Sequence, residues 1–357
     1  MSLLFTPWRV RGLTVANRAW VSAMCQYSAT DGVVGDWHLA HLGSLATGGF
    51  GLVMAEATAV APEARISVRC PGLWNDEQVT AWRRVTDFAH AQGAHIGVQL
   101  AHAGRKASTM APWDDHPFAL ASEGGWTAVA PSELAFDGYP PPRALRVEEI
   151  DRVVDQFVAA ARRARRAGFD VLEIHAAHGY LLHQFLSPLS NQRDDAYGGS
   201  FENRTRLVLR VAEAVRAAEP DVPLFVRLSA TDWVEGGWDL DQTVALARAL
   251  RESGVDLVDV SSGGNVATAV VPVGPGYQVP FASAVRGGAG VATSAADLIT
   301  EPDQAESILV DGDADAIMVA RAALRNPRWA LNAAEALGEF IDWRPQLERA
   351  RTLRASR

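Results

Sequence analysis

The sequence predicts an α/β protein in which eight parallel strands close into a (β/α)8 barrel, the TIM barrel, inside a ring of helices. Three observations favour this fold. A unit of amphipathic helix, glycine and short apolar run recurs along the chain. Strands that alternate with helices form parallel sheets with right-handed crossovers. The first apolar run leads into Met24-Cys-Gln-Tyr27, where an open dinucleotide-binding sheet would carry Gly-x-Gly-x-x-Gly.

One copy of the unit lies in the middle of the chain. Apolar residues recur at helical spacing from Val147 to Ala161, Gly168 provides the left-handed residue that commonly ends a helix, and Val171–Ile174 has the length of a buried strand. The next helix is expected from Phe201 to Ala218. Ser200 precedes it as the N-cap, because a serine hydroxyl accepts a hydrogen bond from the first turn.

The same order of helix, glycine and strand predicts the other elements. The expected helices are His38–Thr47, Glu77–Ala91, Leu240–Glu252 and Pro302–Val310. The expected strands are Ala19–Ser22, Leu52–Glu56, Ile96–Leu100, Leu224–Arg227, Leu257–Ser261, Gly290–Ala292 and Ala316–Ala320. Residues 104–146 lack periodicity and are rich in proline, so we predict an insertion after the third strand that caps the barrel mouth. We expect one barrel domain over 1–340 and a C-terminal tail over 341–357.

The composition is that of an ordinary globular protein. Hydrophobic residues make up 48% of the 357 residues and charged residues 21%. The net charge of −9 leaves no basic footprint for nucleic acid. Cys25 and Cys70, the two cysteines, allow no disulfide framework and suit a reducing compartment. No apolar run reaches the roughly 18 residues of a membrane span, and the first residues lack the apolar core of a signal peptide. We therefore expect a cytoplasmic protein with no membrane partner.

In a barrel of this kind, the chemistry is expected at the carboxyl ends of the strands. The residues there are Met24–Tyr27, Glu56–Thr58, Gln99–His102, His175–Tyr180, Arg227–Ser229, Ser261–Gly264, Thr293–Ala295 and Ala320–Arg321. Hydrogen-bond donors dominate this ring, which suits an electron-rich planar ligand with a phosphate. A metal site would need further ligands beside the histidine pair. Acyl transfer would need a nucleophile paired with a base. Neither pattern is evident.

Three motifs in the second half of the chain carry a family resemblance. His175-Ala-Ala-His-Gly-Tyr180, Ser190-Asn-Gln-Arg193 and Tyr197-Gly-Gly-Ser-Phe-Glu-Asn-Arg204 resemble the old yellow enzymes, which are FMN-dependent ene-reductases on a (β/α)8 barrel. Met24, Cys25 and Tyr27, with Gln99–Lys106 and Gly274–Pro280, are similar to the bacterial thermophilic-like subclass that includes the xenobiotic reductases. The resemblance extends from about Leu4 to Arg349.

The resemblance implies a noncovalently bound FMN. Gln99 would meet the pyrimidine edge of the flavin, Arg227 the N1–C2 carbonyl side, and Cys25 the N5 and O4 atoms. The residues that would line the flavin are Ser22, Ala23, Met24 and Ala57; those at its phosphate end are Ser294, Ala320 and Arg321. The chain departs from the family pattern with Ala23 in place of proline, and with Ser294, Asp297 and Ala320 in place of glycines. An added Cβ hinders close backbone approach to a phosphate, so Arg321 is the firmer expectation there.

The resemblance also implies an NADPH dehydrogenase that reduces the C=C bond of α,β-unsaturated carbonyl compounds. NAD(P)H, with NADPH expected, would give a hydride to flavin N5 in a ping-pong cycle, and the flavin would pass it to the alkene. His175 and His178 would bind the substrate carbonyl oxygen, Tyr180 would protonate the α-carbon, and Tyr27 would close the pocket. Cys25 would tune the flavin.

A residue from a neighbouring subunit would complete this pocket. In the subclass, an arginine in a Glu-Arg pair near the C-terminus reaches the partner's substrate site, and Glu348-Arg349 matches that pair. The implied assembly is a homodimer or an oligomer built from dimers. The implied partners are otherwise small activated alkenes.

Other functions remain open from the sequence. Related reductases of dienoyl thioesters carry an iron–sulfur cluster, which two cysteines cannot ligate. A metal-dependent barrel hydrolase could use His175 and His178. A flavin-binding barrel without physiological turnover would carry the same residues. No motif names the alkene or separates NADPH from NADH.

Overall fold

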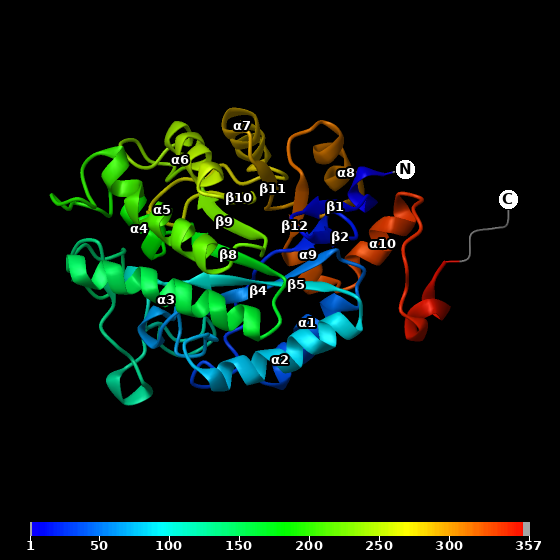
Figure 1. The fold of residues 1–357 in the computed structure, drawn as a ribbon, viewed down its shortest axis with the longest axis horizontal. Helices are drawn as coiled ribbons and strands as arrows, with labels where there is room; N and C mark the ends of the chain where they lie inside the picture. Colours follow the sequence, from blue (N-terminus) through cyan, green and yellow to red (C-terminus); the bar gives the residue numbers. More distant parts are fainter. Residues whose placement is uncertain (1, 353–357) are drawn as a thin grey trace.

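The computed structural model describes residues 2–352 of the chain, and its core is a closed barrel of eight parallel strands. Going round the barrel, the strands follow the order β10-β11-β12-β3-β4-β5-β8-β9. They are β3 (Ala19–Val21), β4 (Leu52–Ala59), β5 (His95–Ala101), β8 (Val171–Ala176), β9 (Leu224–Ser229), β10 (Leu257–Ser261), β11 (Ala292–Ala295) and β12 (Ala316–Val319). The predicted (β/α)8 barrel is confirmed (Figure 1).

Helices surround the barrel. They are α1 (Asp36–Ala46), α2 (Asp76–Ala91), α3 (Val147–Arg166), α4 (Leu181–Leu186), α5 (Phe201–Ala218), α6 (Leu240–Glu252), α7 (Val279–Ala289), α8 (Pro302–Val310), α9 (Arg321–Arg325) and α10 (Trp329–Ala336). The Ser200 side chain accepts a hydrogen bond from the Asn203 amide, which confirms the predicted N-cap of α5. Among the described helices, none is long and apolar enough to cross a membrane.

The predicted glycine stops are present, and one of them corrects a strand. Gly168, Gly254 and Gly312 have φ angles of 96°, 88° and 76°, the left-handed region that glycine adopts without a steric penalty. Gly290, expected to open a strand, is instead the left-handed C-cap of α7, with φ 64°. The seventh strand of the barrel in chain order therefore begins at Ala292, and the prediction of Gly290–Ala292 was wrong. A glycine after a helix should have been assigned to the helix end.

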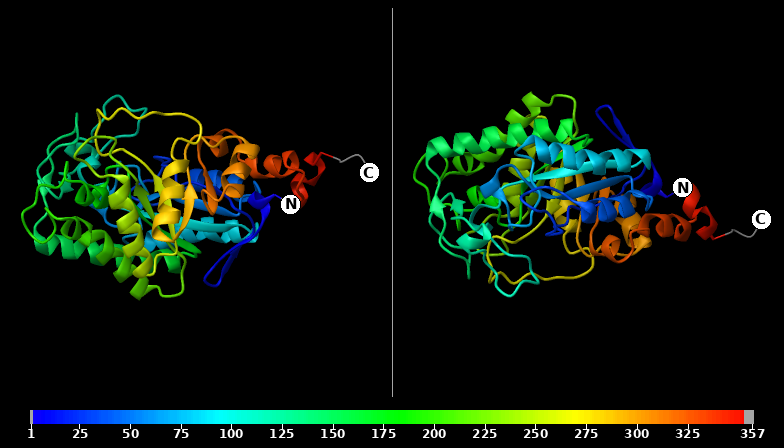
Figure 2. Two further views of the ribbon diagram at one scale, coloured as in Figure 1. Left: turned by 90° about the horizontal axis from the view of Figure 1, so that it is seen from above. Right: turned by 90° about the horizontal axis from the view of Figure 1, so that it is seen from below.

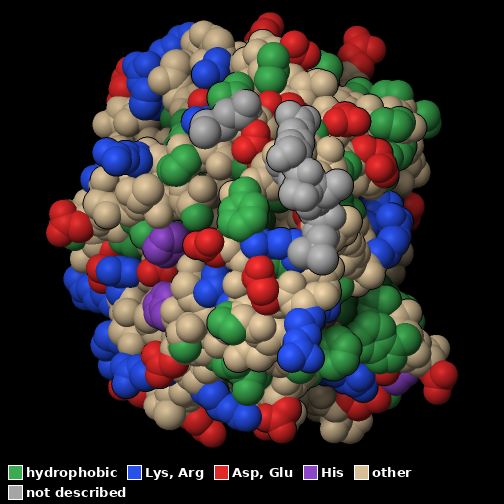
Figure 3. All heavy atoms as spheres, turned by 90° about the vertical axis from the view of Figure 1, so that its right-hand side faces the viewer, with side chains coloured by type: hydrophobic (Ala, Val, Ile, Leu, Met, Phe, Trp, Pro, Cys, Tyr) green, Lys and Arg blue, Asp and Glu red, His purple; other side chains and the backbone are tan. Residues whose placement is uncertain are grey.

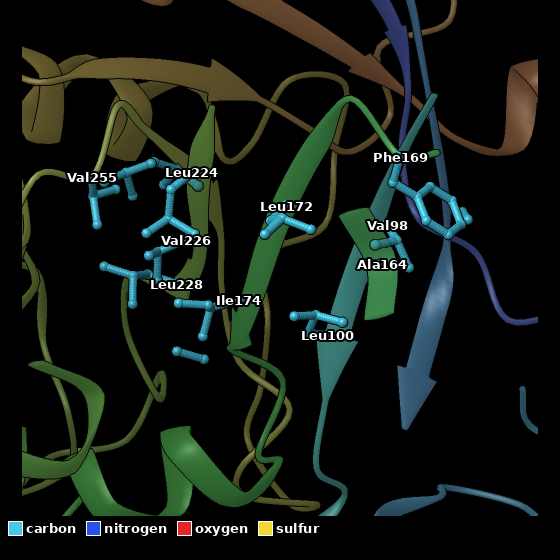
Figure 4. Close-up of a cluster of buried hydrophobic side chains, with 14 of the residues drawn as sticks. Val98, Leu100, Ala164, Phe169, Leu172, Ile174, Leu224, Val226, Leu228 and Val255 are labelled. Carbon is cyan, nitrogen blue, oxygen red and sulfur yellow. The ribbon is translucent and has the colours of Figure 1, made fainter. Parts of the chain in front are cut away.

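Side chains of each strand alternate between the helices and the barrel interior. Leu172 and Ile174 of β8 face outward and lie beside Val226 and Leu228 of β9 in the apolar layer under the helices (Figure 4). Full burial of such a side chain contributes roughly 1.5–3 kcal/mol. Because the period of a strand is two, the intervening Glu173 points into the barrel. The outward layer thus holds the fold together, and the inward side chains are free to form a site.

The amino end of the barrel is closed by aromatic side chains. A hairpin of β1 (Trp8–Val10) and β2 (Leu13–Val15) covers this end. Trp8 meets Trp20 edge to face at 5.3 Å between ring centroids, and Trp20 stacks on Phe225 at 5.9 Å. The interior is therefore filled at this end. Space for a ligand remains at the carboxyl end.

The segment 104–146 lies at the carboxyl end and has little regular structure. It contains two 3-10 turns, Gly104–Lys106 and Ala121–Glu123, and a short pair of strands, β6 (Val129–Ala130) and β7 (Arg143–Ala144). Figure 2 shows this segment as long loops beyond the barrel, at the end far from both termini.

The C-terminal segment packs against the amino end of its own barrel. A Cβ built on Gly49, just before β4, would lie 3.0 Å from Ile341, and one on Gly93, just before β5, would lie 3.5 Å from Arg344. Pro345–Ala350 forms a 3-10 helix with no buried residue. Residues 353–357 of the predicted tail lie outside the described residues. Figure 3 shows the side of the molecule at the amino end of the barrel, where acidic and basic side chains are interspersed.

Candidate active site

A layer of polar side chains crosses the barrel interior above the aromatic plug. Gln99 donates to Glu173 through Nε2 at 2.8 Å. Arg227 pairs with Asp259 at 3.0 Å between Nε and Oδ2, and donates to the hydroxyl of Ser22 at 3.2 Å. All five side chains are buried. Ser22 follows β3, and the other four lie on the neighbouring strands β5, β8, β9 and β10, so the fold gathers them from distant parts of the chain.

The expected flavin contacts lie in this layer. Within residues 2–352, Nη1 of the buried Arg227 donates to Ser22, and Nε has no hydrogen-bond partner beyond its ion pair with Asp259. Gln99 offers its amide beside it. A guanidinium and an amide side by side can donate to the carbonyl oxygens of a flavin pyrimidine ring and accept from its N–H. The residues present therefore fit the pyrimidine end of FMN.

The phosphate end of the predicted site is less enclosed. Asp297, Ala320 and Arg321 line one small cavity after β11 and β12, and the Arg321 side chain is exposed. Ser294 lies inside β11 and donates its hydroxyl to Asp259 at 2.8 Å, so its side chain faces the barrel interior. Barrels commonly bind phosphate at this place. Arg321 is the cation positioned to hold it.

Two histidines and a tyrosine converge at the end of β8. The rings of His175 and His178 meet edge to face with centroids 5.1 Å apart, and those of His175 and Tyr180 at 5.0 Å. His178 and Gly179 have φ angles of 58° and 72°. This pair of left-handed residues reverses the chain directly after the strand. The predicted trio thus forms one cluster.

The loop that carries these rings is held from several sides. The amide of His178 donates to Ser229 at 2.9 Å, and the amide of Gly179 donates to His183 Nδ1 at 2.9 Å. His183 in turn pairs with the fully buried Asp232 at 3.1 Å. Burial alone would raise the pKa of Asp232, but His183 lowers it to about 2. A left-handed non-glycine residue costs on the order of 1–3 kcal/mol, which these contacts offset.

Both site histidines are neutral at physiological pH. Burial, reinforced by the positive charges of Arg227 and Lys106, lowers the pKa of His175 and of His178 well below the ordinary value. The Ala177 amide donates to His175 Nδ1 at 3.3 Å, so the ring proton of His175 is on Nε2. Ser261 Oγ lies 2.7 Å from His178 Nε2. A neutral imidazole has one N–H to donate.

Cys25 and Tyr27 lie on the opposite side of the cluster. Cys25 packs with Tyr180 against a small core that contains Cys70 and Ala57. A hydrogen bond to Cys70 and burial raise the pKa of Cys25 well above its ordinary value, so it is a thiol and not a thiolate. Tyr27 meets Trp113 edge to face at 5.7 Å. Ala23 and Met24 are half-buried between Ser22 and Cys25.

The sequence motifs assigned no role to Arg105 and Lys106. In the structure, both side chains donate hydrogen bonds to loops around the site. Lys106 donates to the carbonyl oxygens of His178 and Gly264, both at 2.9 Å. Arg105 donates to the carbonyl oxygens of Asn265 at 2.7 Å and Leu134 at 3.2 Å. The two cations thus join the histidine loop, the loop after β10 and the segment 104–146.

One sequence signal could have identified Lys106. It is the only lysine of the chain, among 33 basic residues. Burial, with Arg105 beside it, lowers its pKa to about 8. Glu173 and Asp259 were also missed as site residues, and Ser261, expected at a strand end, was given no role. For the two carboxylates the signal was a charged residue inside an apolar strand, which is almost never buried unless paired.

Arg349 does not reach this cluster in its own subunit. Its side chain is exposed on the 3-10 helix Pro345–Ala350. That segment packs at the amino end of the barrel, whereas His175, His178 and Tyr180 lie at the carboxyl end (Figure 1). Within residues 2–352, no group of three or more His, Cys, Asp and Glu side chains could hold a metal ion.

Comparison with known proteins agrees with the geometry. The model of the NADH:flavin oxidoreductase / NADH oxidase family matches residues 3–339. An NADPH dehydrogenase from Listeria monocytogenes is 49% identical over 353 residues, 98% of this chain and 99% of that protein. An NADPH dehydrogenase from Halalkalibacterium halodurans is 44% identical over 349 residues, 97% and 98% of the two chains.

Solved structures show the same architecture. Morphinone reductase superposes with a TM-score of 0.79 at 29% identity, covering 97% of this chain and 92% of that one. An old yellow enzyme homologue from Zymomonas mobilis superposes with a TM-score of 0.78 at 30% identity, covering 95% and 94%. The chain belongs to the NADH:flavin oxidoreductase / NADH oxidase family and is an oxidoreductase of the old yellow enzyme type that uses FMN and NAD(P)H.

Proposed function

We propose that the protein is an ene-reductase, which uses NADPH to reduce the C=C bond of α,β-unsaturated carbonyl compounds in a ping-pong cycle. The observation that carries this proposal is the convergence of two neutral imidazoles and a phenol above the polar layer that fits FMN. Bound FMN supplies the hydride chemistry. The side chains of this chain supply the orientation of the alkene, the polarisation of its carbonyl and the proton.

The two histidines are proposed to bind the carbonyl oxygen of the alkene. His175 presents Nε2–H, because its Nδ1 accepts from the chain. If the Ser261 hydroxyl donates to His178 Nε2, the ring proton of His178 is on Nδ1 and points away from that serine. Two donors aimed at one oxygen stabilise the negative charge that develops on it as the double bond is reduced. Ser261 then acts as the residue that sets the tautomer of His178.

Tyr180 is proposed to protonate the α-carbon. Burial raises the pKa of its phenol well above the ordinary value, with Cys25 adding to the shift. The group therefore keeps its proton over the working pH range and can deliver it. Its ring lies beside His175, so a carbonyl bound at the histidines would have its α-carbon near the phenol. Tyr27 is proposed to close the other side of the pocket, and Cys25 to tune the flavin as a weak donor.

The segment 104–146 is proposed to cap the mouth. It is tied to the rim by Arg105, which donates to the carbonyl of Asn265 at 2.7 Å, and by Arg193, which donates to the carbonyl of Pro131 at 2.9 Å. Trp126 donates to the carbonyl of Glu63 at 2.9 Å. Excluding water strengthens every electrostatic contact inside the pocket. Because Arg349 lies at the other end of its own barrel, we further propose that it completes the site of a partner subunit in a two-fold dimer.

The test is a cycle of colour under anaerobic conditions. Purified holoprotein should be yellow, bleach with NADPH, and regain its colour when a cyclic enone is added. If NADPH bleaches the colour but no activated alkene restores it, the ene-reductase proposal fails. The protein would then be a flavin-binding barrel without turnover. A metal-dependent hydrolase has no support from the geometry, since His175 and His178 have no third ligand among the described residues.

A further inference from the structure

Two buried carboxylates face one guanidinium beneath the flavin site. Arg227 of β9 lies between Asp259 of β10 and Glu173 of β8 in the polar layer. Asp259 and Glu173 are both 1% exposed, and Arg227 is 6% exposed. Below them the interior is apolar, with Val171, Phe225 and Leu257 in one cluster. An unpaired ionised carboxyl is costly in such surroundings, so the cluster has one negative charge too many for its single cation.

The two carboxyl groups are not equivalent. Asp259 has the guanidinium at 3.0 Å on one oxygen and the hydroxyl of Ser294 at 2.8 Å on the other. Glu173 has only the neutral amide of Gln99, at 2.8 Å from Oε1. Its second oxygen, Oε2, is buried without a hydrogen-bond partner among the described residues. The partners available thus favour the ionised form of Asp259 and the acid form of Glu173.

We infer that Glu173 is a positioning residue for the flavin contacts Gln99 and Arg227, and that it acts as a neutral carboxylic acid which takes part in proton uptake when the bound cofactor is reduced. As an acid, it leaves the charge of Arg227 offset by Asp259 alone. It also orients Gln99 by accepting from its amide. Nothing in the proposed substrate chemistry of His175, His178 and Tyr180 requires this residue.

The electrostatics agree with the geometry. Burial raises the pKa of Glu173 to about 8, with the charge of Asp259 adding to it and Arg227 opposing it. Burial also raises the pKa of Asp259, but Arg227 and Ser294 oppose that shift. Other ionisable groups act on the cluster: His175 and His178, which are neutral, the Cys25 thiol, and Asp297, which adds negative charge. The strands on either side of β8 contribute Gln99 of β5 and Arg227 of β9.

The charge of Glu173 determines the direction in which its ionisation shifts the midpoint potential of the bound cofactor. Ionisation of Glu173 above its pKa adds a negative charge near Arg227 and opposes the uptake of electrons by the cofactor, so the midpoint potential falls. By linkage, uptake of electrons raises the pKa of Glu173, and a proton is bound there. Between the pKa values of the oxidised and reduced protein, the potential therefore falls more steeply with pH than it would without Glu173.

The experiment is a potentiometric titration of the holoprotein from pH 6 to 10. Glu173→Gln, an uncharged side chain of the same shape, should match the wild type at pH 6 and lose the steeper fall around and above pH 8. Glu56→Gln changes another buried barrel glutamate, which pairs with His38, and should keep the steeper fall. If the midpoint potentials of wild type and Glu173→Gln change with pH in parallel, the inference is overturned. This outcome does not depend on whether the proteins reduce enones.

A second measurement covers a variant that folds or binds FMN poorly. The infrared spectrum of wild-type protein at pH 7 should contain the carbonyl stretch of a buried protonated carboxyl group, which disappears above pH 9. This band should be absent from Glu173→Gln and present in Glu56→Gln. A wild-type spectrum without it would show that Glu173 is ionised at neutral pH and would reject the inference without reference to turnover.

Discussion

The ring of Tyr180 meets the ring of His175 edge to face, with centroids 5.0 Å apart and planes at 76°. His175 leaves β8 pointing into the barrel, and Tyr180 returns beside it after the left-handed turn at His178 and Gly179. A hydrogen-bond donor and a proton donor thus lie side by side over one pocket. The roles proposed for them differ, so substitutions should separate them.

Replacement of Tyr180 by phenylalanine should impair one half of the reaction. The phenol is proposed to act only in protonation of the alkene, and a positioned acid contributes ~10²–10⁴-fold. Stopped-flow traces should show reoxidation by an enone slowed by that order, with reduction by NADPH close to wild type. Tyr197→Phe removes a phenol whose hydroxyl accepts from Arg210 of α5, outside the site, and is the matched control that should leave both halves unchanged. Equal slowing of both halves in Tyr180→Phe would point to a structural role.

Substitution of either histidine should weaken ligands that carry a phenolate or carbonyl oxygen. Loss of a hydrogen bond to a charged group costs about 1.5–3 kcal/mol, which corresponds to roughly 10–100-fold in the dissociation constant. Phenol titrations of His175→Ala and His178→Ala, followed by the charge-transfer band, measure this. Since both pKa values lie well below the ordinary range, wild-type binding should show no histidine transition near pH 6.5. Unaltered titrations in both variants would remove the histidines from the site.

Lys106→Met should loosen the loop that carries His178. It removes the two hydrogen bonds from Nζ to the carbonyl oxygens of His178 and Gly264. We expect thermal unfolding to show a loss of about 1–3 kcal/mol, and KM for the enone to rise more than kcat falls. Lys106→Arg keeps a charge but offers a planar fork to a site built for a compact ammonium, so it should rescue only in part. Full stability and wild-type KM in Lys106→Met would contradict the account.

Stability should fall at acidic pH because buried histidines remain neutral in the folded protein. Burial lowers the pKa of His102 to about 4, against an ordinary value of about 6.5. Below pH 6.5 the unfolded chain binds a proton that the folded chain does not, so this contribution is complete above pH 6.5 and is lost as the pH falls toward 4. The expected loss is at most about 3 kcal/mol. Urea unfolding of His102→Gln should depend less on pH than urea unfolding of the wild type.

The proposed dimer predicts recovery of activity when two defective proteins are mixed. Arg349→Ala and Tyr180→Phe should each be impaired. After subunit exchange, a mixed dimer would contain one site that lacks both groups and one site that lacks neither. Activity above that of either parent is expected, measured alongside light scattering. A monomer in solution, or no recovery after proven exchange, would contradict a shared site.

Local patterns in the sequence were sufficient for the barrel and for part of the site. The helical spacing that ends at Gly168 and the apolar run that begins at Val171 are short-range signals. The structure has a helix and a strand at these positions. The same is true of His175, His178 and Tyr180, which lie within one loop. Gly290 was misassigned because a glycine between a helix and a strand can belong to either.

The missed residues depend on contacts between distant parts of the chain. Glu173 pairs with Gln99, and Asp259 pairs with Arg227. The four residues lie on four different strands. Lys106 receives its role from the loops after β8 and β10. The pairs form between neighbouring strands, Gln99 of β5 with Glu173 of β8 and Arg227 of β9 with Asp259 of β10. Spacing along the sequence does not show which side chains the register will place opposite one another.

The most direct test of the proposed function is the fate of deuterium in one turnover of a cyclic enone. With NADPH labelled at the transferred position, the saturated ketone should carry deuterium at the β-carbon. With unlabelled NADPH in D2O, deuterium should appear at the α-carbon, and this step should be slowed in Tyr180→Phe. An allylic alcohol as product, or donor label at the α-carbon, would contradict carbonyl binding by His175 and His178 with protonation from Tyr180.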